Sequence, residues 1–206
     1  MSATVEKPNE IALDMLREVG NIGAGNAMTA LATMVNRKVG MSVPHVGIVQ
    51  LSDFAQMTGG AEALAVAVYM QVDGDAPGHV AFLWSFAHAC LLVDAVLQRE
   101  DGTTQQLDEL ERSVLMEVGN ILASSHLVAT CELTGLELFS SPPGIAIDMT
   151  AAILSTIASA FASMEDHAVT IASHIGHGAN VVEGYFLFIP ESGSLNIMLR
   201  ALNMDI

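Results

Sequence analysis

The chain has 206 residues, of which 51% are hydrophobic, and a formal net charge of −16 at pH 7. This length is sufficient for one large domain or two small ones. With 7 Lys and Arg residues against 23 Asp and Glu, the chain has too few cations to neutralise phosphates, so we expect no nucleic-acid partner and no anionic membrane surface. Because the first ten residues are polar and do not resemble a secretory signal, we expect a cytoplasmic protein with no membrane insertion.

The first half of the chain begins with a helical pattern. Asn9 is a candidate N-cap, apolar residues recur at three-residue steps from Leu13 to Ile22, and Gly40 marks the end of the pattern. Alternating apolar residues and turn residues then predict three strands, and a second helical pattern closes this half. The strands are expected over residues 46–51, 63–72 and 79–84, and the helix over residues 87–98.

The second half has the same order. A long helix is predicted from a possible capping box of Thr103 and Gln106 to a stop at Gly135. The apolar run of residues 145–164 contains Asp148 and many small polar residues, so we interpret it as an added helix that is buried or faces a partner, not as a membrane span. Two strands and a final helix are expected over residues 168–174, 181–189 and 192–204.

An internal repeat accounts for this shared order. Residues 18–22 read EVGNI, and the same five letters recur 99 residues later at residues 117–121. We therefore expect two copies of one unit, over residues 9–98 and 104–204. The predicted fold is α+β, with pseudo-two-fold symmetry in a single domain and helices flanking a shared sheet.

Each long helix carries a polar triplet opposite its apolar stripe, because residues spaced by three and four share one side of a helix. The triplets are Asp14, Glu18 and Asn21 in the first helix, and Ser113, Glu117 and Asn120 in the second. One such face is ordinarily a solvated surface. The same Glu and Asn in two copies indicate a requirement for those two side chains.

Glycines surround the first triplet at a cost in helix stability. Gly20, Gly23 and Gly25 lie inside the predicted helix, where each costs about 0.8 to 1.0 kcal/mol relative to Ala. Either a neighbouring helix approaches closely, or a bare surface lets another protein approach Asn21. Because Gly119 repeats Gly20, we consider this pair the better candidate for a site role.

The spacing of the triplets resembles a known signature. An Asp or Ser, three residues, a Glu, two residues, an Asn, twenty-two residues and a Pro are typical of the CheC/CheX/FliY family of chemotaxis phosphatases. The two copies here are Asp14, Glu18, Asn21 and Pro44, and Ser113, Glu117, Asn120 and Pro143. Two copies over essentially the whole chain are most similar to the CheC type. The CheX type is shorter with one working site, and the FliY type has a C-terminal flagellar-switch domain that we do not expect here.

The resemblance implies that the chain hydrolyses the aspartyl phosphate of a CheY-type response regulator. The regulator would carry Mg²⁺ and a Lys at its own active site, so the chain would need no metal or cofactor. Asn21 and Asn120 would hold the attacking water, since a carboxamide offers a donor and an acceptor without a charge beside the phosphoryl group.

The resemblance also implies roles for the other members of the triplets. Glu18 and Glu117 would each pair with a Lys at the regulator's active site. Asp14 and Ser113 would support them by local hydrogen bonds. Pro44 and Pro143 are expected to be structural, because Pro has no side-chain chemistry to offer.

The same resemblance implies a second partner and an alternative function. The family also binds CheD, and the implied contact is Asp148, in the helix expected to begin near residues 147–149. Helix N-capping explains this Asp equally well. The alternative function is a non-catalytic adaptor that sequesters phosphorylated CheY or CheD.

Overall fold

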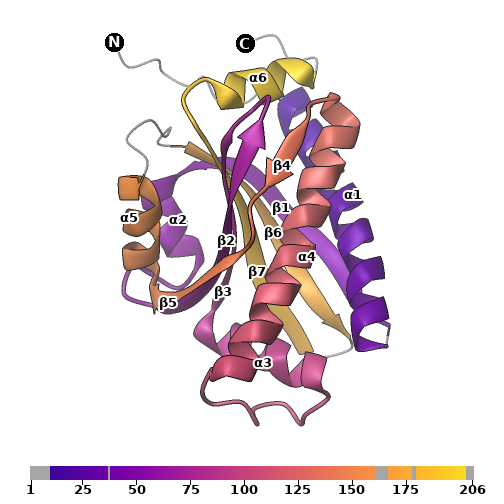
Figure 1. Ribbon diagram of the computed structural model, residues 1–206, viewed down its shortest axis with the longest axis vertical. Helices are drawn as coiled ribbons and strands as arrows, with labels where there is room; N and C mark the ends of the chain where they lie inside the picture. The colour runs from indigo at the N-terminus through magenta and orange to yellow at the C-terminus, as the bar shows by residue number, and fades with distance from the viewer. Residues whose placement is uncertain (1–9, 37, 161–166, 178–179, 203–206) are drawn as a thin grey trace.

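An antiparallel sheet runs through the middle of the computed structural model, which describes residues 10–36, 38–160, 167–177 and 180–202 (Figure 1). Its strands are β1 (Gly40–Gln50), β2 (Leu64–Gly74), β3 (Gly78–Ser85), β4 (Leu138–Ser140), β5 (Gly144–Met149), β6 (His167–His177) and β7 (Asn180–Pro190). The helices are α1 (Glu10–Val35), α2 (Leu51–Met57), α3 (Phe86–Leu97), α4 (Glu109–Thr134), α5 (Thr150–Ala160) and α6 (Ser194–Ala201). The expected α+β domain with helices flanking a shared sheet is confirmed.

The order of the strands interleaves the two halves of the chain. Across the sheet it is β1, β6, β7, β3 and β2, with β5 and β4 both paired to the far side of β2. Strand β1 of the first half therefore lies beside β6 of the second half, and β5 of the second half lies beside β2 of the first. Strands β3 and β7 pair at the centre. This is the expected pseudo-two-fold arrangement. The exact limits of the two repeats stay a prediction, and part of each lies outside the described residues.

Two hydrophobic layers cover the two faces of the sheet. Side chains of α1, α3, α4 and α6 pack on one face around Phe82 and Trp84, both fully buried. Side chains of α2 and α5 pack on the other face around Phe54 and Leu83. The two long helices α1 and α4 lie next to each other in the first layer (Figure 1). The sheet thus fixes the position of both helices that carry the polar triplets.

The predicted elements differ from the structure in two regions. Residues 145–149 were expected to be helical but form most of β5, which pairs with β2; α5 begins only at Thr150. Ile145 and Ile147 pack toward the α1 and α4 layer, whereas Ala146 packs toward the other layer, which is the alternation of a strand. The rest of the expected helix after residue 160 lies outside the described residues. Helix α2 and strand β4 were not predicted.

The expected capping box is also wrong. Helix α4 begins at Glu109 with Asp108 as its N-cap residue, five positions after Thr103. The hydroxyl of Thr103 instead donates to the carbonyl oxygen of Glu100 in the connection between α3 and α4. A local turn therefore competes successfully with the capping motif for this side chain.

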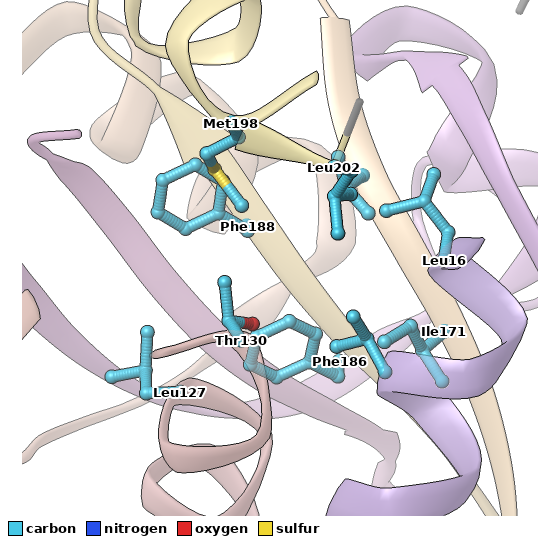
Figure 2. Close-up of a pocket in the computed structure, with 10 residues that line it drawn as sticks. Leu16, Leu127, Thr130, Ile171, Phe186, Phe188, Met198 and Leu202 are labelled. Atoms are coloured by element: carbon cyan, nitrogen blue, oxygen red, sulfur yellow. The ribbon is translucent and has the colours of Figure 1, made fainter. Parts of the chain in front are cut away.

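A small cavity remains between the inner sides of α1 and α4, the sheet and α6. Its volume is about 10 Å³, and Figure 2 shows Leu16, Phe186 and Met198 among the side chains around it. Thr130 is the polar residue of the lining, and its hydroxyl donates to the carbonyl oxygen of His126 at 2.8 Å. A space this small and apolar is a packing gap, not a binding site.

One described helix, α4, has the length and hydropathy of a membrane span. Half of the relevant window (50%) is buried inside the domain. The helix packs against both α1 and the sheet, as the core helix of a folded domain does. Its composition therefore reflects its central position.

Candidate functional site

The triplet of α1 faces away from the sheet. Asp14, Glu18 and Asn21 are exposed, whereas Leu16 and Val19 between them are 3% and 4% exposed and belong to the core. The helix is amphipathic here because the polar residues recur at steps of four and three while the apolar ones occupy the other side. The expected outward orientation of this triplet is thus what the structure has.

The triplet of α4 has the same orientation but is slightly more enclosed. Ser113 and Glu117 are exposed and Asn120 is partly buried, while Leu115 and Val118 are fully buried. Since α1 and α4 lie side by side in one layer, both triplets point to solvent from the same side of the sheet. Each triplet places a carboxylate one helical turn before a carboxamide.

The key side chains of the triplets are largely unengaged. Among the described residues, Glu18, Asn21 and Glu117 have no side-chain hydrogen bond or ion pair. The carboxamide of Asn120 accepts a hydrogen bond from the hydroxyl of Ser124 at 3.4 Å. Both carboxylates and the first carboxamide are therefore free to bind another molecule.

Asp14 makes a local bond, but not to its own triplet. Its carboxylate accepts a hydrogen bond from Arg17 at 2.6 Å, and both side chains are exposed. An exposed ion pair of this kind contributes about 0 to 1 kcal/mol. Asp14 therefore adjusts the position of a cation next to Glu18, and the supporting role expected for Asp14 and Ser113 stays a prediction.

The glycines of the long helices are explained by packing inside the domain. A Cβ added to Gly119 would lie 2.5 Å from the Cβ of Val68, and one added to Gly20 would lie 3.2 Å from a methyl of Ile171. Both glycines are buried against the sheet. The expected site role for this pair is therefore wrong, because the bare side faces the core and not a partner.

The other two glycines differ from each other. A Cβ on Gly23 would lie 2.9 Å from the ring of His126 in α4, so this glycine allows the two long helices to approach closely. A Cβ on Gly25 would meet nothing within 4 Å. Gly25 is thus the glycine of the first helix whose surroundings are open.

His126 is a buried group that the sequence did not reveal. Its ring stacks on Phe186 with a centroid distance of 4.8 Å, and Nδ1 lies 2.8 Å from the carbonyl oxygen of Leu122. Nδ1 must carry the proton, since a carbonyl oxygen accepts hydrogen bonds and cannot donate them. Burial lowers the pKa of His126 to about 4, so the ring is neutral at pH 7. The sequence did not show that Gly23 makes room for this ring, because that contact exists only when α1 and α4 lie side by side.

Asp148 lies in β5, two residues before α5 begins. It is exposed, pairs in register with Ala65, and accepts a hydrogen bond from the backbone N–H of Met149 at 2.7 Å. The expected helical setting and the N-capping explanation are both wrong, because α5 begins two residues later. Asp148 is thus not part of either triplet but belongs to the strand next to β2.

The two prolines lie at irregular points of the strands. Pro44 falls within β1 where the register with β6 shifts between Ser42 and His45, and Pro143 directly precedes β5. A proline is tolerated in a strand at a bulge or an edge, where its missing N–H breaks no ladder bond. This placement agrees with the structural role expected for both.

No residue of the triplets lines the small cavity beside α6 or a second, larger cleft. A cleft of about 640 Å³ between α1, α3 and the hairpin of β6 and β7 contains none of their residues. Within the part of the chain that the structure describes, no three His, Cys, Asp or Glu residues gather closely enough to hold a metal ion. Exposed side chains outside these hollows fit a protein substrate better than a small molecule.

Solved structures with the same fold define the class to which the domain belongs. FliY from Thermotoga maritima has a TM-score of 0.78 and 19% identity, covering 97% of this chain and 98% of that one. A chain of the FliG–FliM complex from H. pylori has a TM-score of 0.68 and 10% identity, covering 93% and 99%. The fold is therefore the one shared by FliY and this chain of the FliG–FliM complex.

Sequence comparisons identify the family within that class. A profile of the CheC-like family matches residues 11–48, which include the first triplet. The CheY-P phosphatase CheC of Bacillus subtilis (strain 168) is 30% identical over 201 residues, which cover 96% of each chain. The flagellar motor switch phosphatase FliY of the same organism is 23% identical over 142 residues, 68% of this chain and 37% of that protein. The chain belongs to the CheC-like family.

Proposed function

We propose that the chain is a phosphatase that hydrolyses the aspartyl phosphate of a CheY-type response regulator. The observation that carries this proposal is the outward-facing pair of Glu and Asn, one turn apart, which occurs once on α1 and once on α4. The B. subtilis relative of similar length is named a CheY-P phosphatase, which supports the same activity. A phosphatase of this kind acts in the cytoplasm, where response regulators are found.

The chemistry requires little more than an oriented water. Water attacks the phosphorus atom, the bond between phosphorus and the aspartyl oxygen breaks, and the products are inorganic phosphate and a free carboxylate. The regulator supplies Mg²⁺ and a Lys that neutralise the phosphoryl oxygens, so the chain needs no cofactor of its own. Asn21 and Asn120 would each accept a hydrogen bond from the water through Oδ1 and donate to a phosphoryl oxygen through Nδ2.

The glutamates would set the depth at which the carboxamides enter the regulator's active site. Glu18 and Glu117 precede the Asn by one turn and lie on the same side of their helices. Because these carboxylates have no partner within the described residues, each is available to pair with a Lys of the regulator. In a chain of net charge −16, such a specific pair also sets where a partner with a cationic site binds.

CheD is the second partner that we propose, at the surface around Asp148. Leu64 and Met149 form the next register pair along β2 and β5 and are 46% and 48% exposed, so an exposed charge and exposed apolar side chains occur at the same end of these strands. Undiminished CheD binding by the Asp148→Lys variant, measured by calorimetric titration, would exclude this position.

Turnover distinguishes the phosphatase from an adaptor that only sequesters its partners. Phosphorylated regulator is mixed in large excess with the chain, and the release of inorganic phosphate is recorded over time. We expect release faster than the spontaneous rate, with several phosphates per chain. Release that is unchanged or slower would identify an adaptor and overturn the proposal.

A further inference from the structure

The two carboxamides differ in the residue that stands one turn further along the helix. Four residues after Asn120, on the same side of α4, stands Ser124, whose hydroxyl donates to Oδ1 of Asn120 at 3.4 Å. Four residues after Asn21 stands Gly25, which has no side chain. Asn120 is partly buried and Asn21 is exposed. The two sites therefore share their reactive groups but not the support of the carboxamide.

The hydroxyl of Ser124 behaves unlike the threonine hydroxyls of the same two helices. Those of Thr29, Thr33, Thr130 and Thr134 each donate to the backbone carbonyl oxygen four residues earlier. That backbone bond is the usual one for a hydroxyl inside a helix. Ser124 instead donates to the side chain four residues earlier, and this side chain is the one assigned to the attacking water.

We propose that Ser124 is a positioning residue for Asn120, and that the first site lacks this restraint because Gly25 replaces the serine. This inference rests on the proposed phosphatase function. The terminal torsion of an Asn is broad, with two nearly equivalent orientations that exchange oxygen and nitrogen. A donor at Oδ1 favours the orientation in which Nδ2 points away from Ser124.

The hydrogen bond from Ser124 leaves the other acceptor and donor positions of the Asn120 carboxamide available. An amide oxygen has two lone pairs, so one remains for the attacking water while Ser124 occupies the other. Both N–H groups of Nδ2 stay available for phosphoryl oxygens. A donor at Oδ1 also polarises the amide and strengthens these N–H groups as donors. Because 3.4 Å is long for a hydroxyl bond, the effect is a few-fold in rate, not orders of magnitude.

The second site is tested in the Asn21→Ala background, in which Asn120 is the remaining carboxamide. There, Ser124→Ala should lower kcat about threefold to tenfold, the range that corresponds to one neutral hydrogen bond, with KM unchanged. Ser124→Thr keeps a hydroxyl and should retain most of kcat. An unchanged kcat in Ser124→Ala, or an equal loss in Ser124→Thr, overturns the proposal.

The first site offers the reciprocal test in the Asn120→Ala background. Gly25→Ser should raise kcat about twofold or more, since the space around Gly25 is open and the new hydroxyl would stand four residues after Asn21, as Ser124 stands after Asn120. Gly25→Ala adds the same Cβ without a hydroxyl and is the matched control. If Gly25→Ala raises kcat as much as Gly25→Ser, the gain comes from helix stability and the proposal fails.

A readout without turnover separates this proposal from the phosphatase function. In NMR relaxation measurements on the free protein, the side-chain NH₂ group of Asn120 should be more rigid than that of Asn21, and Ser124→Ala should remove the difference. Equal mobility in the unsubstituted protein overturns the positioning role, whether or not phosphate is released. Absent phosphate release with a rigid Asn120 overturns the phosphatase function instead.

Discussion

Helices α1 and α4 share an outward Glu and Asn but differ where they contact each other inside the domain. Each has 26 residues and presents the same Glu and Asn to solvent. Toward the core, however, α1 has Ala27 where the 99-residue displacement places His126 in α4, and it has Gly23 where α4 has Leu122. The outward pair is thus retained, and so are buried residues that face the sheet, such as Val19 and Val118, whereas the residues at which the two helices meet differ. Since the outward Glu and Asn are not part of the core, their retention indicates a demand that packing alone does not impose.

The inward differences are complementary. Gly23 receives the ring of His126, so a small residue of one helix makes room for a large residue of the other. Close packing of this kind is sensitive to volume changes as small as one methylene. The two helices therefore form one rigid layer in which the outward triplets hold fixed positions.

Among the differences between the two helices, His126 should have the largest effect on stability. Helix α1 has no ionisable group at the corresponding position. Burial lowers the pKa of His126 from its ordinary value of 6.5 to about 4. Between these values the unfolded chain binds more protons than the folded one, so the free energy of unfolding falls as the pH falls from 6.5 to 4. The loss is on the order of 3 kcal/mol, and the contribution is fully present above the unfolded pKa.

Urea denaturation of the protein and of His126→Phe at several pH values measures this contribution. The many surface carboxylates are common to both proteins, so the difference between the two pH profiles isolates His126. The variant should lose less stability between pH 6.5 and 4. Parallel profiles would show that His126 is not sealed between the helices.

A smaller effect concerns the glycines at corresponding positions of the two helices. Gly119→Ala should destabilise the protein by about 1 to 3 kcal/mol, because the new Cβ would meet Val68 at 2.5 Å in the core. Gly20→Ala should be close to neutral, since its 3.2 Å contacts are with the methyl groups of Ile171 and Val43 and the helix gains about 0.8 to 1.0 kcal/mol.

Gly25→Ala is the matched control for both glycines. Its Cβ would meet nothing within 4 Å, so only the gain in helix propensity of about 0.8 to 1.0 kcal/mol remains. Denaturation midpoints should therefore rank Gly25→Ala above Gly20→Ala and Gly119→Ala last. If Gly119→Ala were as stable as Gly25→Ala, the claim that Gly119 allows α4 to approach Val68 closely would be contradicted.

The features that sequence predicted well are local ones. The outward placement of Glu18 and Asn21 results from helical spacing, which needs no knowledge of the rest of the fold. The strand at residues 145–149 was mistaken for a helix because a short apolar run is ambiguous until its pairing with β2 is known. The role of Gly119 depends on Val68, in a distant strand of the other half of the chain, and the bond of Ser124 depends on a side-chain orientation. Neither is visible in the pattern of letters.

The central claim is that the two outward carboxamides carry the reaction, and the Asn21→Ala/Asn120→Ala double variant tests it most directly. Both positions face solvent, so the substitutions should leave the fold and the binding of phosphorylated regulator largely intact. The account predicts that the double variant releases phosphate only at the spontaneous rate of the regulator. Release at the rate of the unsubstituted protein would contradict it.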